Sequence, residues 1–113
     1  MKLQIIQPTH YRSPSDRTLH KTRKRSVVNL TLPYLAALVP AGWDVSLVDE
    51  QLDEIDFDAP VDAVAITTWT MNSLRAYEVA DRFRSRGTAV LMGGPHTSFH
   101  SEEAAGHADA VCT

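Results

Sequence analysis

The hydrophobic and polar positions divide the chain into short apolar runs separated by polar loops and helical stripes. Apolar runs that are nearly continuous occupy residues 3–6, 45–48, 63–66 and 89–92. Runs of this length, without strict alternation, are typical of strands in a parallel sheet that is covered on both faces. A shorter run at 110–112 predicts a fifth strand.

Between these runs the apolar residues recur at helical spacing. Residues 34–39 predict a helix, and Pro33 is tolerated there because it falls in the first turn. The clearest helical pattern covers residues 72–86, where Asn72 is suited to cap the N-terminus. A shorter helix is expected to begin at Ser101.

Strands that alternate with helices predict an α/β protein. We expect a Rossmann-like (flavodoxin-like) three-layer sandwich, formed by a parallel sheet of about five strands in the order 2-1-3-4-5. A chain of 113 residues has room for one such domain, residues 1–113. In these sheets ligands bind beyond the carboxyl ends of the strands, where the strand order reverses. The loops after the first, third and fourth strands are therefore the places to search for a site.

Composition narrows the class of partner. A net charge of −3 argues against nucleic acid as a partner, which needs a concentrated positive face. No stretch approaches the roughly 18 apolar residues of a membrane span, and the first residues do not resemble an export signal. We therefore expect a cytoplasmic protein. Cys112 is the single cysteine and cannot by itself hold an iron–sulfur cluster, which takes about four ligands.

The loop after the first strand is long and runs from Pro8 to about residue 27. Structureless connections longer than about 12–15 residues are uncommon in compact domains and are usually functional or disordered. This loop contains Thr9, His10 and a basic run at 20–25. We favour a solvated, mobile loop for the basic run, with contact to a phosphate or an acidic surface as the alternative.

The loop after the third strand contains Thr67, Thr68 and Trp69. The hydroxyls can donate hydrogen bonds to a ligand, and the indole offers a flat apolar face. An equally good interpretation is a hydroxyl-closed turn before the next helix, with Trp69 as a packing residue.

The loop after the fourth strand, Gly93-Gly94-Pro95-His96-Thr97, is the most specific. Two glycines at the end of a buried strand let a ligand approach the main chain closely, and this edge is where ligands bind. We expect no metal site at His96 and His100, because Pro95 and the loop context place both residues outside any helix.

These loops and their neighbours resemble cobalamin-binding domains that precede radical-SAM domains. The resemblance is carried by residues 34–38, 42–45, 48–49, 62–67, 93–97, 102–104 and 108–111. It implies that the chain is an N-terminal domain excised from a radical-SAM enzyme and is not catalytic alone. The 4Fe-4S cluster and S-adenosylmethionine would belong to the radical-SAM domain of the same parent chain.

The resemblance also implies roles for the loops. Gly93 and Gly94 would line the groove for the nucleotide tail of cobalamin, and Thr67, Thr68 and Trp69 would lie near the tail or the lower face of the corrin. The cofactor-binding residues that we predict are Thr9, His10, Thr67, Thr68, Trp69, Gly93, Gly94, Pro95 and His96.

One motif departs from the family. Domains that donate a histidine to cobalt carry Asp-x-His-x-x-Gly after the first strand, whereas here Pro8 and Ser13 stand at the aspartate and glycine positions around His10. A ligating histidine usually needs an acceptor that fixes its ring, and Pro8 cannot serve as one. We therefore expect cobalamin to be held without ligation by His10. The alternative is a degenerate domain that binds no cofactor and acts as an interaction or substrate-covering module.

Overall fold

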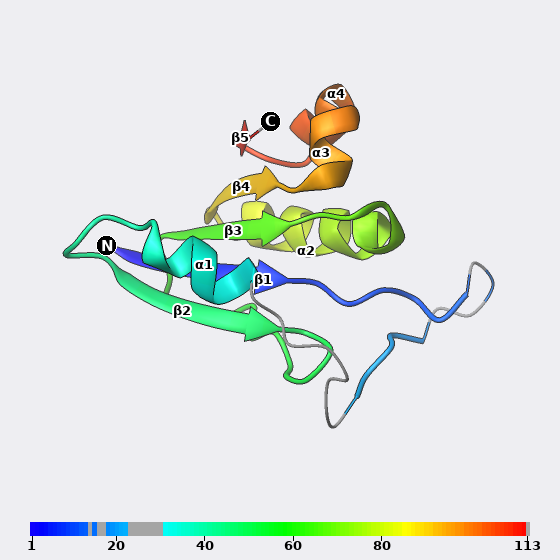
Figure 1. Cartoon of the computed structure of the whole chain (residues 1–113), viewed down its shortest axis with the longest axis horizontal. Helices are drawn as coiled ribbons and strands as arrows, with labels where there is room; N and C mark the ends of the chain where they lie inside the picture. The colour runs from blue at the N-terminus through cyan, green and yellow to red at the C-terminus, as the bar shows by residue number, and fades with distance from the viewer. Residues whose placement is uncertain (14, 16–17, 23–30, 113) are drawn as a thin grey trace.

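The computed structural model describes residues 1–13, 15, 18–22 and 31–112, and these form a five-stranded parallel sheet with helices on both faces (Figure 1). The sheet order is β2-β1-β3-β4-β5, and every neighbouring pair is parallel. The predicted fold class and strand order are confirmed. The strands are β1 (Lys2–Gln7), β2 (Asp44–Asp49), β3 (Ala63–Thr67), β4 (Ala89–Gly93) and β5 (Ala110–Val111).

Four α-helices and one 3-10 turn connect the strands in the described part of the chain. They are α1 (Thr31–Ala37), η1 (Thr70–Asn72), α2 (Ser73–Ser85), α3 (Pro95–Phe99) and α4 (Ser101–Ala105). None of these helices has the length and apolar character needed to cross a membrane.

The first helix lies further toward the N-terminus than the sequence pattern predicted. It covers Thr31–Ala37 rather than residues 34–39. Leu32 anchors the helix in the core with only 4% of its surface exposed, whereas Leu38 is 64% exposed and lies beyond the helix end. Leu38 is therefore an apolar residue at the surface, in the turn that follows the helix, and is not part of the helix.

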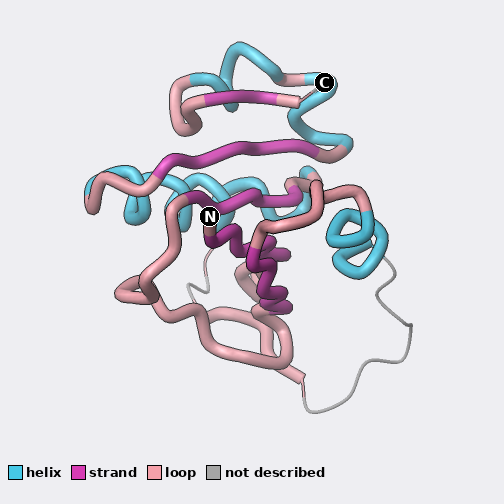
Figure 2. The backbone as a smooth tube through the Cα atoms, turned by 90° about the vertical axis from the view of Figure 1, so that its left-hand side faces the viewer, coloured by secondary structure: helices cyan, strands magenta, loops and turns pink. Residues whose placement is uncertain are grey.

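One face of the sheet carries the main core. Strand alternation sends Val64, Ile66, Val90 and Met92 to the side covered by α2, where they join Phe83 in one buried cluster. Helix α2 contacts β3 and β4 on this side, and α4 contacts β5 (Figures 1 and 2). Burial of these large side chains is the main stabilising contribution to the fold.

The opposite face is covered only in part. Helix α1 contacts β1 and β2 there, while Leu91 on β4 is 43% exposed and Ala89, Ala110 and Cys112 are exposed. The expectation of a sheet buried on both faces is therefore wrong for β4 and β5. Alanine counts as apolar in a run of residues, but it is small enough to lie at the surface at little cost.

The loop after β1 is more ordered in its described part than we predicted. Tyr11 and Leu19 form an antiparallel bridge, and the His20 amide donates to the His10 carbonyl at 2.9 Å. The Lys21 ammonium donates to the carbonyls of Glu50 and Asp53. A solvated loop is therefore the wrong description for the first two residues of the basic run, and residues 23–25 lie outside the described part.

Candidate functional site

The three loops that the sequence singled out lie at one edge of the sheet. The arrowheads of β1, β3 and β4 point the same way in Figure 1, so the loops after Gln7, Thr67 and Gly93 are neighbours. In a parallel sheet this carboxyl edge, where the order switches between β1 and β3, is the usual place for a ligand.

The double glycine makes the turn from β4 into α3. Gly94 has a φ of +107°, and a Cβ there would lie 2.7 Å from the Thr68 carbonyl oxygen and 2.9 Å from its amide nitrogen. Only glycine combines this backbone angle with such a close approach. At Gly93 a Cβ would meet only Cys112, at an ordinary 3.6 Å. The two glycines therefore differ: Gly94 is required by backbone packing, whereas Gly93 leaves open space.

That space is part of a cavity of about 270 Å³ between α1 and the carboxyl ends of β3 and β4, which we name the edge cavity. Its wall is mostly apolar and is built largely from small residues and main chain. The lining residues are Leu35, Ala65, Ile66, Thr67, Trp69, Leu91, Met92, Gly93, Gly94, Pro95 and Cys112.

Two buried hydroxyls near the edge cavity, Thr67 Oγ1 and Thr68 Oγ1, have no hydrogen-bond partner among the residues that the structure describes. Thr67 lines the edge cavity, whereas Thr68 is fully buried and does not. An unpaired buried hydroxyl costs about 1–3 kcal/mol, so a ligand that pairs with Thr67 would recover that cost.

Asn72 connects two of the loops. It precedes α2, but its side chain makes no capping bond to the helix, contrary to our expectation. Its Oδ1 instead accepts the Trp69 amide at 2.7 Å, and its Nδ2 donates to the Pro8 carbonyl at 3.1 Å. Asn72 therefore ties the loop after β1 to the loop after β3.

A buried ion pair supports the same edge and was missed by the sequence analysis. Glu50, 1% exposed, accepts from Arg75 Nε at 3.0 Å, from Arg75 Nη2 at 2.6 Å and from the Thr9 amide at 3.1 Å. Burial opposes the charge of Arg75, but the hydrogen bond and charge of Glu50 prevail and raise the pKa of Arg75. No local sequence pattern indicates this pair, because Glu50 directly follows β2 whereas Arg75 lies on α2, 25 residues later.

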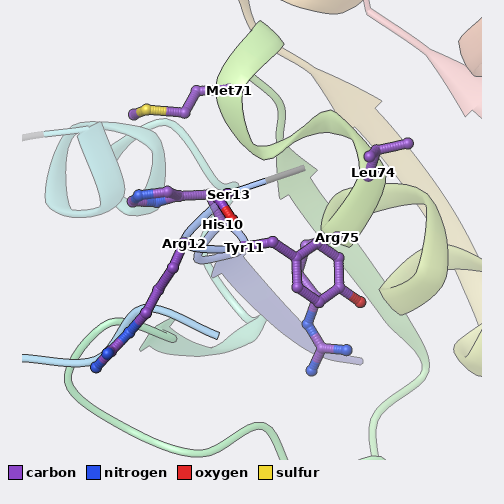
Figure 3. Close-up of a pocket in the computed structure, with 7 residues that line it drawn as sticks. All are labelled: His10, Tyr11, Arg12, Ser13, Met71, Leu74 and Arg75. Atoms are coloured by element: carbon purple, nitrogen blue, oxygen red, sulfur yellow. The ribbon is translucent and has the colours of Figure 1, made fainter. Parts of the chain in front are cut away.

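His10 lies on the α2 side of the edge and lines two further hollows. One, of about 360 Å³, is shown in Figure 3 and is also lined by Tyr11, Met71, Leu74 and Arg75, among others. The other, of about 200 Å³, lies between the loops after β1 and β3, and Trp69 and Asn72 are among its lining residues.

The His10 ring stacks on His20 with centroids 5.0 Å apart. Burial, and secondly the neighbouring His20, lower the pKa of His10, so the ring is neutral at pH 7. Within the described residues, no carboxylate or carbonyl accepts a hydrogen bond from this ring, in keeping with the missing aspartate of the family motif. Whether His10 contacts the cofactor stays a prediction.

His96 turns away from the edge cavity. Its Nδ1 lies 3.2 Å from Thr70 Oγ1, and its Nε2 lies 3.1 Å from both Tyr77 Oη and Glu103 Oε1. Burial and the hydrogen bond to Glu103 raise the pKa of Tyr77, and the bonds from Tyr77 and His96 lower the pKa of Glu103. This network fastens α3 to α2 and α4 and gives His96 a structural role.

His96 also lies inside the short helix α3, Pro95–Phe99, which corrects our placement of it outside any helix. Proline is suited to the first turn of a helix, so Pro95 begins α3 rather than preventing it. The His96 and His100 rings are 4.6 Å apart, yet no group of three or more metal-ligating side chains is found among the described residues.

The structure thus separates the predicted site residues into two sets. Thr67, Trp69, Gly93, Gly94 and Pro95 line the edge cavity, and His10 lines the adjoining hollows. Thr9, Thr68 and His96 are buried and line none of these spaces. The Thr9 hydroxyl donates to the His20 carbonyl at 2.6 Å, so Thr9 supports the loop.

A five-stranded parallel sheet with a cavity at its switch-point edge defines a small α/β ligand-binding domain. The model of the B12 binding domain family matches residues 17–113, and the chain belongs to this family. The resemblance to cobalamin-binding domains is confirmed.

Two curated proteins of Chlorobaculum tepidum are similar to the chain. Bacteriochlorophyllide d C-8(2)-methyltransferase is 43% identical over 91 residues, which cover 80% of this chain and 20% of that protein. Bacteriochlorophyllide d C-12(1)-methyltransferase is 36% identical over 85 residues, which cover 73% of this chain and 18% of that protein. The chain therefore spans about a fifth of the length of these relatives. No solved structure matches it.

Proposed function

We propose that this domain binds cobalamin at the carboxyl edge of its sheet and positions it for methyl transfer by a larger parent protein. The observation that carries the proposal is the edge cavity, an apolar space beside small residues with the unpartnered Thr67 hydroxyl at its wall. Membership of the B12-binding family supports the choice of ligand.

The size of the edge cavity suits one part of the cofactor. A volume of about 270 Å³ is slightly below the roughly 300–1,000 Å³ of pockets that enclose a whole drug-sized ligand. It suits the flat base of the nucleotide tail, with the larger corrin ring outside the sheet edge. The residues that would contact the tail are Ala65, Thr67, Leu91 and Gly93, and those that would contact the corrin are His10 and Trp69.

Each of these residues would either contact the cofactor or exclude water from it. The apolar wall removes the flat base from water, and Thr67 Oγ1 supplies a hydrogen-bond donor or acceptor that no protein group uses. Gly94 holds the α3 turn against Thr68 and thereby keeps the cavity mouth in place. When bound, cobalamin supplies a cobalt centre that carries a methyl group to an acceptor carbon.

The parent's reaction is part of the same proposal. Both relatives are named methyltransferases, so we propose that the parent is one as well. We further propose that it contains a radical-SAM domain, with a 4Fe-4S cluster and S-adenosylmethionine, which approaches the carboxyl edge and is the partner of this domain.

Retention of hydroxocobalamin tests the proposal directly. Purified residues 1–113 are mixed with excess hydroxocobalamin and desalted, the visible spectrum is recorded, and a dissociation constant is obtained by titration. Gly93→Leu fills the edge cavity and should weaken binding at least tenfold, about 1.4 kcal/mol. Ala89→Leu is the control, because Ala89 is on the same face of the same strand, is exposed and does not line the cavity.

A folded wild-type domain that retains no cobalamin, alone or within its full-length parent, would refute the proposal. The alternative function, an interaction or substrate-covering module that keeps the fold, would then take its place. The observation that favours this alternative is the exposed Leu91 on the uncovered half of the sheet, which a protein partner would bury.

A further inference from the structure

Asn72 is a buried polar residue at the boundary between two loops that the proposed function requires. It is 6% exposed, and it is the last residue of η1, directly before the first residue of α2. A buried side-chain amide is costly unless both its carbonyl and its amino group find partners. Asn72 satisfies both, through the Trp69 amide and the Pro8 carbonyl.

These bonds hold two segments that are far apart in sequence. Pro8 immediately follows β1 and is two residues before His10, whereas Trp69 follows β3. Trp69 is held at both ends of its backbone, because its carbonyl also accepts the Asn72 amide at 3.1 Å. One side chain therefore bonds directly to both the His10 loop and the Trp69 loop.

The indole of Trp69 lies where two of the spaces at this edge meet. It is 49% exposed and lines both the edge cavity and the hollow that His10 shares. A ligand that fills both spaces would therefore contact this ring. Asn72 bonds to the Trp69 backbone, from which the ring extends.

Capping of α2 does not account for the residue, and capping of η1 accounts for its bond to the Trp69 amide but not for its bond to Pro8. Asn72 stands at the N-cap position of α2, but its side chain makes no bond to the first turn of that helix. Serine, threonine and aspartate are equally good caps, yet none of them presents both an amide donor and a carbonyl acceptor on one planar group. The Asn72 side chain uses both, since its Oδ1 accepts from Trp69 and its Nδ2 donates to Pro8.

We infer that Asn72 is a positioning residue for cobalamin, which holds Trp69 and the His10 loop at the spacing that the bound cofactor needs. The inference rests on the proposed function and adds to it a residue that lines the hollow shared by His10 and Trp69 but does not line the edge cavity. Asn72 acts through Trp69 and Pro8.

Tryptophan fluorescence supplies a readout that a purely structural role would not change. The chain has two tryptophans, and Trp43→Phe leaves Trp69 as the single emitter. Bound cobalamin absorbs where indole emits, so the quenching of Trp69 at saturation reports its position relative to the cofactor. Hydroxocobalamin is titrated into three proteins on this background: unchanged, Asn72→Ala and Asn72→Asp.

Asn72→Ala removes both bonds and should weaken binding about tenfold, with incomplete quenching at saturation. Asn72→Asp keeps the acceptor for the Trp69 amide and loses the donor to Pro8. It should retain nearly full quenching and lose affinity. The control is Ala80→Gly, which destabilises the same helix at a buried position with no contact to the edge.

The possible results separate this inference from the function on which it rests. If Asn72→Ala binds and quenches like Ala80→Gly, Asn72 is only a structural residue and the inference is wrong, while the proposed function stands. If the unchanged background shows no retention and no quenching, and the full-length parent retains no cobalamin either, the proposed function fails and the inference fails with it.

Discussion

Replacement of Arg75 by methionine should be among the most destabilising single substitutions at this edge. It removes the guanidinium that donates to Glu50 at 3.0 and 2.6 Å. Among the described residues, the 1% exposed carboxylate then keeps only the Thr9 amide as a hydrogen-bond donor. Removal of one partner from a buried ion pair costs about 3–5 kcal/mol. That is a large part of the roughly 5–15 kcal/mol that stabilises a typical domain.

The measurement is urea-induced unfolding, followed by circular dichroism, with the free energy of unfolding obtained by linear extrapolation. The double variant Glu50→Gln/Arg75→Met removes the charge and keeps an acceptor for the Thr9 amide. It should recover most of the loss. Arg82→Met is the matched control, because this arginine is on the same helix, is exposed and lies over the Phe57 ring at 3.7 Å, a contact worth about 1 kcal/mol or less.

A loss below about 1 kcal/mol for Arg75→Met would refute the reasoning, because it would mean that Glu50 reaches water without its partner. Equal losses for Arg75→Met and Arg82→Met would do the same. Equal losses for the single and double variants would show that packing of the arginine stem, rather than the buried charge, dominates.

Other positions lead to equally specific expectations. Thr67→Val and Thr68→Val each remove an unpaired buried hydroxyl and should raise the free energy of unfolding by about 1 kcal/mol, but only Thr67→Val should weaken cobalamin binding in a titration. Gly94→Ala should destabilise the domain by about 2 kcal/mol or more in the same unfolding assay, since its Cβ would meet the Thr68 carbonyl at 2.7 Å. For His10, the folded pKa lies below the unfolded value of about 6.5, so its contribution to stability is present above pH ~6.5 and is lost as the pH falls through the folded pKa. An NMR titration should give a midpoint below 6.5 that rises in His20→Gln; a midpoint at or above 6.5 in the wild type would contradict the burial argument.

Much of the fold could be predicted because the signals were local. Buried parallel strands are continuous apolar runs, and the stripe of α2 repeats at helical spacing, so each element is recorded in its own residues. The first helix was displaced because Leu38, a surface residue, extended the apparent stripe beyond the true end of α1.

The supports of the site could not be predicted because their partners are distant in sequence. Glu50 and Arg75 are 25 residues apart, and Asn72 and Pro8 are 64 apart. Each residue taken alone is unremarkable: a carboxylate in an acidic segment, an arginine on a helix and an asparagine at a helix start. Only the reversal of strand order between β1 and β3 brings them together.

The two glycines of the double glycine differ in structural role, whereas the sequence analysis gave them one. We expected both glycines to admit a ligand to the main chain, but the close approach at Gly94 is to the protein's own backbone at Thr68. Both glycines line the edge cavity, but only at Gly93 would an added Cβ meet nothing closer than 3.6 Å. The spacing of the two residues cannot distinguish these roles, since both follow from the absence of a side chain.

Side-chain volume along β3 and β4 is the sequence property that would have predicted the edge cavity. Along β3 and β4 the residues that face α2 are large: Val64, Ile66, Val90 and Met92. Those that alternate with them are smaller apart from Leu91: Ala63, Ala65, Thr67, Ala89 and Gly93. Hydropathy does not distinguish the two sets, because alanine and valine both count as apolar, whereas side-chain volume distinguishes them at once. A strand that is large on one face and small on the other leaves space on the small face, and at the carboxyl edge of a parallel sheet that space is where a ligand fits.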